Sequence, residues 1–193
     1  RDSEVGGWLK GPDLNPGAIT GAWAPQNTRE AIYDGIYNRE TFATSGPRIK
    51  VRFFGQFGTA PGVDDYKTMV EQGYANGVPM GGTLKAGTGA PSFTVWATKG
   101  PRELDGNLDR IQIIKSWVDA NGEPQDQVYD VVWSGVRERD AKGKVPAIGN
   151  TVDVKTATFT NTIGASELKG VWTDPAFDAK QGAVYYVRVI QIP

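Results

Sequence analysis

The segment RIQIIKSWVDANGEPQDQVYDVVWS, residues 110–134, predicts a β-hairpin. Two runs rich in β-branched and aromatic residues flank the short segment ANGEP (120–124), whose Asn, Gly and Pro favour a turn. In the first run the apolar residues change parity between Ile113 and Ile114, as one inserted residue would cause. We therefore expect two antiparallel strands with a β-bulge near this step.

The same pattern of short β-type runs recurs through the second half of the chain, and each run is bounded by Gly, Pro, Asn or Asp. Several such strands without intervening long helices favour two packed antiparallel sheets. The predicted fold class is mainly β, an antiparallel β-sandwich over residues 48–193. The expected strands in this half are 92–98, 110–119, 126–134, 156–162, 168–173 and 184–192.

One or two short helices are expected near the N-terminal end. Residues 1–26 contain so many Gly and Pro residues that we expect loop or extended chain there, without a regular element. Asn27 then offers an N-cap with Glu30 three residues later, and apolar residues at helical spacing predict a helix over 28–38. Its apolar stripe is expected to pack against the core. A second helix is expected within 63–76.

Two further strands are expected between these helices, at 41–45 and 48–54. The second alternates strictly between apolar and basic residues, which is typical of a strand with one buried and one solvated face. We expect Ile49, Val51 and Phe53 to be buried and Arg48, Lys50 and Arg52 to face solvent.

Composition excludes several functions. The 21 basic and 22 acidic residues give a net charge of −1, so no global field draws the chain to nucleic acid or to an anionic membrane. The absence of Cys and His excludes disulfides, thiolate sites, Ser-His-Asp catalysis and His-based metal sites. No apolar run approaches the roughly 20 residues of a membrane-spanning helix. Carboxylate pairs, a Lys nucleophile and oxygen-ligated cations remain open.

The corner Thr44-Ser45-Gly46-Pro47-Arg48 is the first candidate binding site. Backbone N–H groups at a tight corner, together with a guanidinium, can hold a phosphate or carboxylate oxygen. A strand-to-strand turn in which Thr44 and Ser45 bond the local backbone explains the same residues, and on the residues alone we favour it.

Three other features have an ordinary explanation. The Gly-rich run 77–82 lacks the Lys and the helix of a phosphate loop, so we interpret it as a turn. Asp174 and Asp178 lack the ligand spacing of a calcium loop and are interpreted as capping or turn residues. Exposed Trp side chains in a row would form a sugar-stacking platform, but core packing is the expected role. The Trp residues are Trp8, Trp23, Trp96, Trp117, Trp133 and Trp172.

A set of short motifs makes the chain resemble a known family. They include NPG (15–17), NTREAI (27–32), FATSGPRI (42–49), GVPMGG (77–82), LDRIQI (108–113), VYDV (128–131), NTIGA (161–165), VWTDP (171–175) and YYVRV (185–189). With these motifs the chain resembles the carboxy-terminal portion of the family called domain of unknown function 3604. That family is similar to the PHP (polymerase and histidinol phosphatase) phosphoesterases. The resemblance covers nearly the whole chain.

The resemblance implies that a metal-binding barrel with His and Asp ligands lies upstream of residue 1 in a longer parent protein. Residues 1–47 would be the tail of that barrel, and residues 48–193 a β-sandwich accessory domain. The barrel would be the chain's partner, would hold the divalent metal and would hydrolyse a substrate of phosphoester type. The chain itself would carry no catalytic residue, metal site or cofactor. Thr44, Ser45 and Arg48 would bind substrate where the chain leaves the barrel.

An alternative function is kept from a different class. An exported β-sandwich could bind a carbohydrate-type ligand through surface Trp side chains. Exposure of the Trp side chains separates this alternative from the accessory module. The compartment stays open, and the family resemblance slightly favours a periplasmic or secreted protein.

Overall fold

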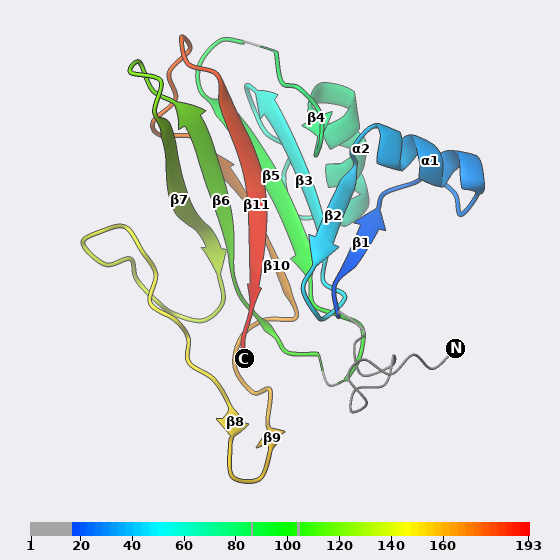
Figure 1. Ribbon diagram of the computed structural model, residues 1–193, viewed down its shortest axis with the longest axis vertical. Helices are drawn as coiled ribbons and strands as arrows, with labels where there is room; N and C mark the ends of the chain where they lie inside the picture. Colours follow the sequence, from blue (N-terminus) through cyan, green and yellow to red (C-terminus); the bar gives the residue numbers. More distant parts are fainter. Residues whose placement is uncertain (1–16, 86, 104) are drawn as a thin grey trace, which may run out of the picture.

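The computed structural model describes residues 17–85, 87–103 and 105–193. Within these ranges the chain forms two short helices and a series of antiparallel strands (Figure 1). In chain order the elements are β1 (Ile19–Ala22), α1 (Arg29–Tyr37), β2 (Thr41–Thr44), β3 (Lys50–Phe57), α2 (Tyr66–Asn76), β4 (Val78–Pro79), β5 (Pro91–Thr98), β6 (Leu108–Val118), β7 (Pro124–Trp133), β8 (Val152–Asp153), β9 (Thr158–Phe159), β10 (Glu167–Thr173) and β11 (Ala183–Gln191).

Two larger sheets form the body of the fold. One has the strand order β10-β5-β3-β4, and the other has the order β11-β6-β7. In Figure 1 the sheet containing β11, β6 and β7 lies in front of the sheet containing β10, β5 and β3. All pairs within both sheets are antiparallel. The prediction of a mainly β, antiparallel sandwich with short helices near the N-terminal end is confirmed.

The predicted hairpin is present as β6 and β7. It turns at Gly122, whose φ of 85° lies in the left-handed region that Gly adopts without strain. The β-bulge predicted near Ile113 and Ile114 is wrong, because both residues pair in regular register with both neighbouring strands. The apolar parity changes there because β6 is buried on both faces: Ile113 is 0% exposed and Ile114 is 2% exposed.

The register shifts instead at the other end of β6. Opposite the step from Ile111 to Gln112, β7 carries one extra residue, Val131. Opposite the step from Ile190 to Gln191, β6 carries one extra residue, Asp109. Extra residues of this kind increase the local twist of a sheet. Both extra residues lie within or directly beside a group of buried charged residues, which is described below.

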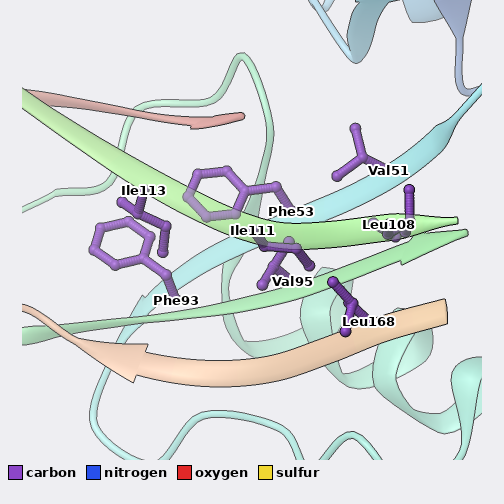
Figure 2. Packing of buried hydrophobic residues seen from close by; sticks show 9 residues of the cluster. Val51, Phe53, Phe93, Val95, Leu108, Ile111, Ile113 and Leu168 are labelled. Atoms are coloured by element: carbon purple, nitrogen blue, oxygen red, sulfur yellow. The ribbon is translucent and has the colours of Figure 1, made fainter. Parts of the chain in front are cut away.

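The core lies between the two sheets (Figure 2). Its buried members come from β3, β5 and β10 on one side and from β6 on the other: Val51, Phe53, Phe93, Val95, Ala97, Leu108, Ile111, Ile113 and Leu168. Burial of each large aliphatic or aromatic side chain contributes about 1.5–3 kcal/mol before the entropy of ordering is subtracted. This shared core holds the sheets face to face.

A second, smaller core lies on the opposite face of β3, under α2. Phe54, Met69 and Trp96 are buried there, and Met69 is fully covered. The helix begins after Asp65, whose carboxylate accepts a hydrogen bond from the Thr68 N–H at 2.7 Å. Both faces of β3 are therefore covered over much of its length.

This second core changes the prediction for the basic row of β3. Arg48 and Lys50 are exposed as expected. Arg52 is half-buried instead, because its guanidinium lies 3.7 Å from the centroid of the Trp23 ring. The guanidinium also donates a 2.9 Å hydrogen bond to the Tyr74 hydroxyl of α2. Of the apolar row, Val51 and Phe53 are buried as expected and Ile49 is half-buried.

The segment from β1 to β2 forms its own antiparallel pair with α1 between the strands. The prediction of no regular element within 1–26 is wrong for β1, because pairing with β2 stabilises a strand despite the neighbouring Gly residues. Residues 1–16 of that segment lie outside the described residues. The helix is capped by Thr28 rather than Asn27, and the Thr28 hydroxyl accepts a hydrogen bond from the Ala31 N–H.

The strand predicted at 156–162 is mostly wrong. Only Thr158 and Phe159 have strand geometry, and they pair with β8 in a two-residue ladder. Asn161 breaks the run with a φ of 51°, and its side chain accepts a hydrogen bond from the Asn107 N–H at 2.9 Å. The Asn161 side chain therefore bonds the loop before β6, while the Thr hydroxyls of this segment bond one another.

Candidate functional site

A deep apolar groove runs between the two sheets on the side where β3 and β11 face each other. Its volume is about 1230 Å³. β3 and β5 supply the floor through Val51, Phe53 and Phe93, and β11 supplies one wall through Tyr185 and Val187. The segment from β4 to Leu84 and the loop before β11 also line it. A pocket of this size with mostly apolar walls is a candidate binding site.

Two of the predicted binding residues reach this groove. Thr44, at the end of β2, and Ser45, just after it, both line the groove. The Thr44 hydroxyl oxygen is buried and has no hydrogen-bond partner among the described residues. Within the described ranges, neither hydroxyl forms the local backbone bond that a simple turn would place on it, and the buried Thr44 hydroxyl can accept a hydrogen bond from a group inside the groove.

Arg48 is separated from this groove. It is exposed and does not line the groove, and within the described ranges it forms no ion pair or hydrogen bond. The corner is held by a backbone bond in which the Ile49 N–H donates to the Pro47 carbonyl at 2.9 Å. The structure therefore brings Thr44 and Ser45 together and points Arg48 elsewhere.

A buried ion pair lies beside the groove and was not predicted. Lys115 of β6 donates a 2.7 Å hydrogen bond to Asp174, which directly follows β10. The two side chains are 4% and 0% exposed. The Tyr185 hydroxyl donates to the same carboxylate oxygen at 2.7 Å, and the Ala176 N–H donates to the other oxygen at 2.9 Å. Asp174 is thus the turn residue that was predicted and also the anchor of an ion pair.

The pKa values in this cluster are shifted by burial and by the partners. Burial by itself raises the pKa of Asp174, but the hydrogen bonds from Lys115, Tyr185 and Ala176 outweigh it, so the pKa lies below its ordinary value. Burial and the hydrogen bond to Asp174 raise the pKa of the Tyr185 hydroxyl. Burial and the charge of Asp174 also raise the pKa of Tyr129. These shifts keep Asp174 ionised and the phenols of Tyr185 and Tyr129 neutral.

A second charged network covers the outer face of the other end of β6. Arg110 pairs with Asp109 and Asp130, and Arg137 also pairs with Asp109. Burial raises the pKa of Asp130, but the Val145 N–H and the neighbouring side chains outweigh it and keep the pKa low. Arg110 also donates to the Val145 carbonyl. The network fastens the loop that follows β7 onto the sheet.

The other sequence features have structural roles. The Gly-rich run 77–82 is the predicted turn: it contains β4, and the Gly82 N–H donates to the Pro79 carbonyl at 3.0 Å. Gly81 has a φ of 80°, and a Cβ there would lie 2.3 Å from the Arg39 carbonyl oxygen, so only Gly fits. Asp178 accepts a hydrogen bond from the Lys180 N–H, as expected of a turn residue.

The five Trp residues within the described ranges do not form an exposed row. Trp96 is buried, and the others are half-buried: Trp23, Trp117, Trp133 and Trp172. None of them lines the groove. Trp8 lies outside the described residues. The described residues therefore do not contain the exposed row of Trp that the carbohydrate-binding alternative expected.

The described residues contain no group of three or more Asp or Glu side chains placed to hold a metal ion. Within the same ranges, the two helices are too short and too polar to cross a membrane.

The fold and the groove define a class of protein: a β-sandwich that is open along one edge and braced by buried ion pairs. Within that class, the chain belongs to the family described as protein of unknown function (DUF3604), whose model matches residues 2–193. No curated protein and no solved structure matches the chain. Because the family description assigns no activity, the function has to be argued from the geometry.

Proposed function

We propose that this chain is the accessory, structural module of a PHP-like metal-dependent hydrolase and is not catalytic by itself. The exposed apolar side of α1 is the observation that carries the proposal. Tyr33, Ile36 and Tyr37 are 64%, 55% and 73% exposed, and the two Tyr rings stack with 6.1 Å between their centroids. Neighbouring exposed apolar side chains of this kind are typical of a contact surface.

The position of α1 supports a partner within the same parent protein. The helix lies within residues 1–47, which by the family resemblance would form the tail of an upstream barrel. Its apolar stripe has the spacing of a packing face but is exposed here. In the parent this face would pack against the barrel. That barrel would hold a divalent metal, which would activate water for hydrolysis of a phosphoester-type substrate.

The corner residues would serve the barrel by binding substrate. Arg48 is exposed and has no partner within the described ranges, so its guanidinium is free to bind an anionic group. Ser45 is also exposed, whereas the Thr44 hydroxyl is turned into the groove. In the parent, Arg48→Lys should weaken substrate use, because the planar two-pronged donor is lost while the charge is kept.

The contact role is tested by a charge on α1. Ile36→Glu should lower the melting temperature or the turnover of the full parent protein, because it would bury a charge at the barrel contact. The same change in the 193-residue chain alone should have little effect, since Ile36 is already exposed. Val136→Glu is the matched control, because Val136 is fully exposed in the loop that follows β7. An unchanged parent carrying Ile36→Glu would argue against packing through α1.

The absence of independent catalysis is tested by an activity assay. The 193-residue chain, supplied with zinc, manganese or magnesium, should not hydrolyse a chromogenic phosphodiester under conditions where the full parent does. Metal-dependent turnover by the chain that survives repurification and disappears on mutation of a carboxylate pair would overturn the accessory role.

A further inference from the structure

The groove lies along an unpaired edge of a sheet. β11 is the outermost strand in its three-stranded sheet among the described residues, whereas the facing sheet has four strands. Figure 1 shows β11 at the edge of the front sheet. In the sheet behind, β3 lies beyond that edge. Among the described residues, no strand therefore lies beside β11 above the floor formed by β3.

The free edge of β11 presents a regular row of hydrogen-bonding groups. The Ile192 N–H donates to the Asn107 carbonyl on the β6 side. Because N–H groups alternate sides along a strand, the N–H and C=O groups of Tyr185, Val187 and Val189 point away from β6. At the end of the β6–β7 hairpin, the Asp119 N–H donates to the Glu123 carbonyl. Odd-numbered residues in this part of β6 therefore face β7 and even-numbered residues face β11, which agrees with this assignment. Within the described ranges, no hydrogen bond uses these edge groups.

β11 also lacks the features that normally protect an edge strand. Such strands carry Pro, Lys or a bulge that prevents further pairing. From Ala183 to Ile190 the strand has none of these and pairs with β6 in regular register. Its only charge, Arg188, lies on the outer face and donates to the Gln112 side chain at 2.9 Å. Within the described residues, this edge is therefore unprotected against pairing with another strand.

The size of the groove matches one strand. A strand residue in a sandwich occupies about 3.3 by 4.8 by 10 Å, roughly 160 Å³, so 1230 Å³ corresponds to about eight residues. β11 has nine residues. The side chains of Tyr185, Val187 and Val189 pack toward the core, so the neighbouring positions of an added strand would face the same apolar floor.

Polar groups that line the groove indicate which groups a bound strand would offer to it. Two buried oxygens without a partner among the described residues, in the hydroxyl of Thr44 and the amide of Gln191, belong to residues that line it. Each can accept a hydrogen bond from a backbone N–H. The charged residues that line it, Lys180 and Arg188, are both basic. The outward positions of an added strand would therefore favour acidic side chains.

We propose that the groove binds an extended segment of another polypeptide as an additional strand beside β11. The segment has apolar residues at every second position, which face Phe53 and Phe93, and acidic residues between them, which face solvent near Arg188. Backbone hydrogen bonds to Tyr185, Val187 and Val189 give the affinity, and the apolar floor selects the alternation. This inference does not depend on the proposed hydrolase partner.

The test uses a synthetic nine-residue peptide in which Glu and Val alternate, mixed with the 193-residue chain. Amide hydrogen exchange is measured by NMR at Tyr185, Val187 and Val189. At a peptide concentration about ten times the Kd, exchange at these amides should slow about tenfold, because only the free fraction exchanges. Amides of the even-numbered residues of β11, which already bond β6, should change little.

Two matched peptides separate strand addition from simple apolar binding. One peptide carries N-methyl groups on the central Val and on the adjacent Glu. Because successive N–H groups alternate sides, one of the two methylated nitrogens must face β11, so this peptide should not bind. The other has Lys in place of Glu and should bind more weakly. Equal binding of the N-methylated peptide would overturn the proposal. Binding of a small apolar dye in the groove, without any peptide-dependent slowing of amide exchange in β11, would also overturn it.

A variant of the chain gives an independent control. Val187→Pro removes one free edge N–H without removing a bond to β6, and should abolish peptide binding. Val187→Thr keeps the N–H and should retain it. If Val187→Pro fails to fold, the N-methylated peptide still decides the question. Protection of the same amides that rises with protein concentration and needs no peptide would assign the edge to a second copy and overturn the proposal.

Discussion

The Lys115 ammonium on β6 lies 2.7 Å from the Asp174 carboxylate that follows β10, so a buried ion pair joins the two sheets of the sandwich. Each partner has a further hydrogen bond, from the Tyr185 hydroxyl to Asp174 and from Lys115 to the Ala176 carbonyl. A buried pair needs its remaining hydrogen-bonding groups satisfied, and here both carboxylate oxygens and two of the three ammonium N–H groups have partners.

Removal of one partner should be costly. Lys115→Met should lower the free energy of unfolding by about 3–5 kcal/mol, because Asp174 would be left buried without its counter-ion. The double variant Lys115→Met with Asp174→Asn should recover part of that loss, since it removes the remaining charge. Urea unfolding followed by Trp fluorescence measures both. Equal losses in the single and double variants would mean that the pair contributes through packing alone.

The stability should fall in acid through Asp174. Its pKa is depressed in the folded chain, so the stabilisation is fully present above the unfolded pKa of about 3.9 and is lost as the pH falls through the folded pKa. The difference in unfolding free energy between wild type and Asp174→Asn should therefore be largest near neutral pH and shrink in acid. A difference that stays constant across this window would exclude Asp174 as a source of the acid sensitivity.

The turn at Gly81 should not accept a side chain. Gly81→Ala should destabilise by more than the roughly 1–2 kcal/mol of a left-handed backbone, because the new Cβ would also meet the Arg39 carbonyl. Gly122→Ala is the matched control: its φ is 85°, but a Cβ there has no atom within 4 Å. Thermal melts of both variants compare the two costs. Equal destabilisation would show that the β4 turn moves freely away from Arg39.

Arg52 should not be replaceable by Lys. The guanidinium lies over Trp23 and donates to the Tyr74 hydroxyl. Arg52 of β3 therefore connects the residue that follows β1 with α2. Arg52→Lys should cost about 0.5–1 kcal/mol through loss of the stacked contact, and it should change the fluorescence of Trp23. Lys50→Arg, on the exposed part of the same strand, should change neither quantity. An Arg52→Lys variant with wild-type stability and emission would contradict the stacked arrangement in solution.

Much of the fold follows from local patterns. The hairpin of β6 and β7, the two helices and most other strands were predictable, because alternation and turn residues act over a few neighbouring residues. The same rules failed at 156–162, where side chains such as Asn161 bond a distant loop instead of a neighbouring strand. They also failed at the step from Ile113 to Ile114, where the change of apolar parity predicted a β-bulge but both faces of β6 are buried.

The candidate site was predicted only in part, because its members come from distant segments. Thr44 and Ser45 were candidates by residue type, but their place in the groove depends on the packing of β2, β3 and β11. Lys115 did carry a signal: it shares the strand face of Ile111 and Ile113, where an unpaired Lys would be unstable. Its partner, 59 residues away, could not be found from spacing alone.

The sequence by itself determined the fold class and the family, and it excluded His- and Cys-based chemistry, because composition, alternation and turn residues are local properties of the chain. Tertiary structure decided which polar residues are buried, which strand is left with a free edge and how large the groove beside it is. Those properties depend on the distance between segments far apart in sequence, such as β3 and β11, and no local pattern specifies that distance.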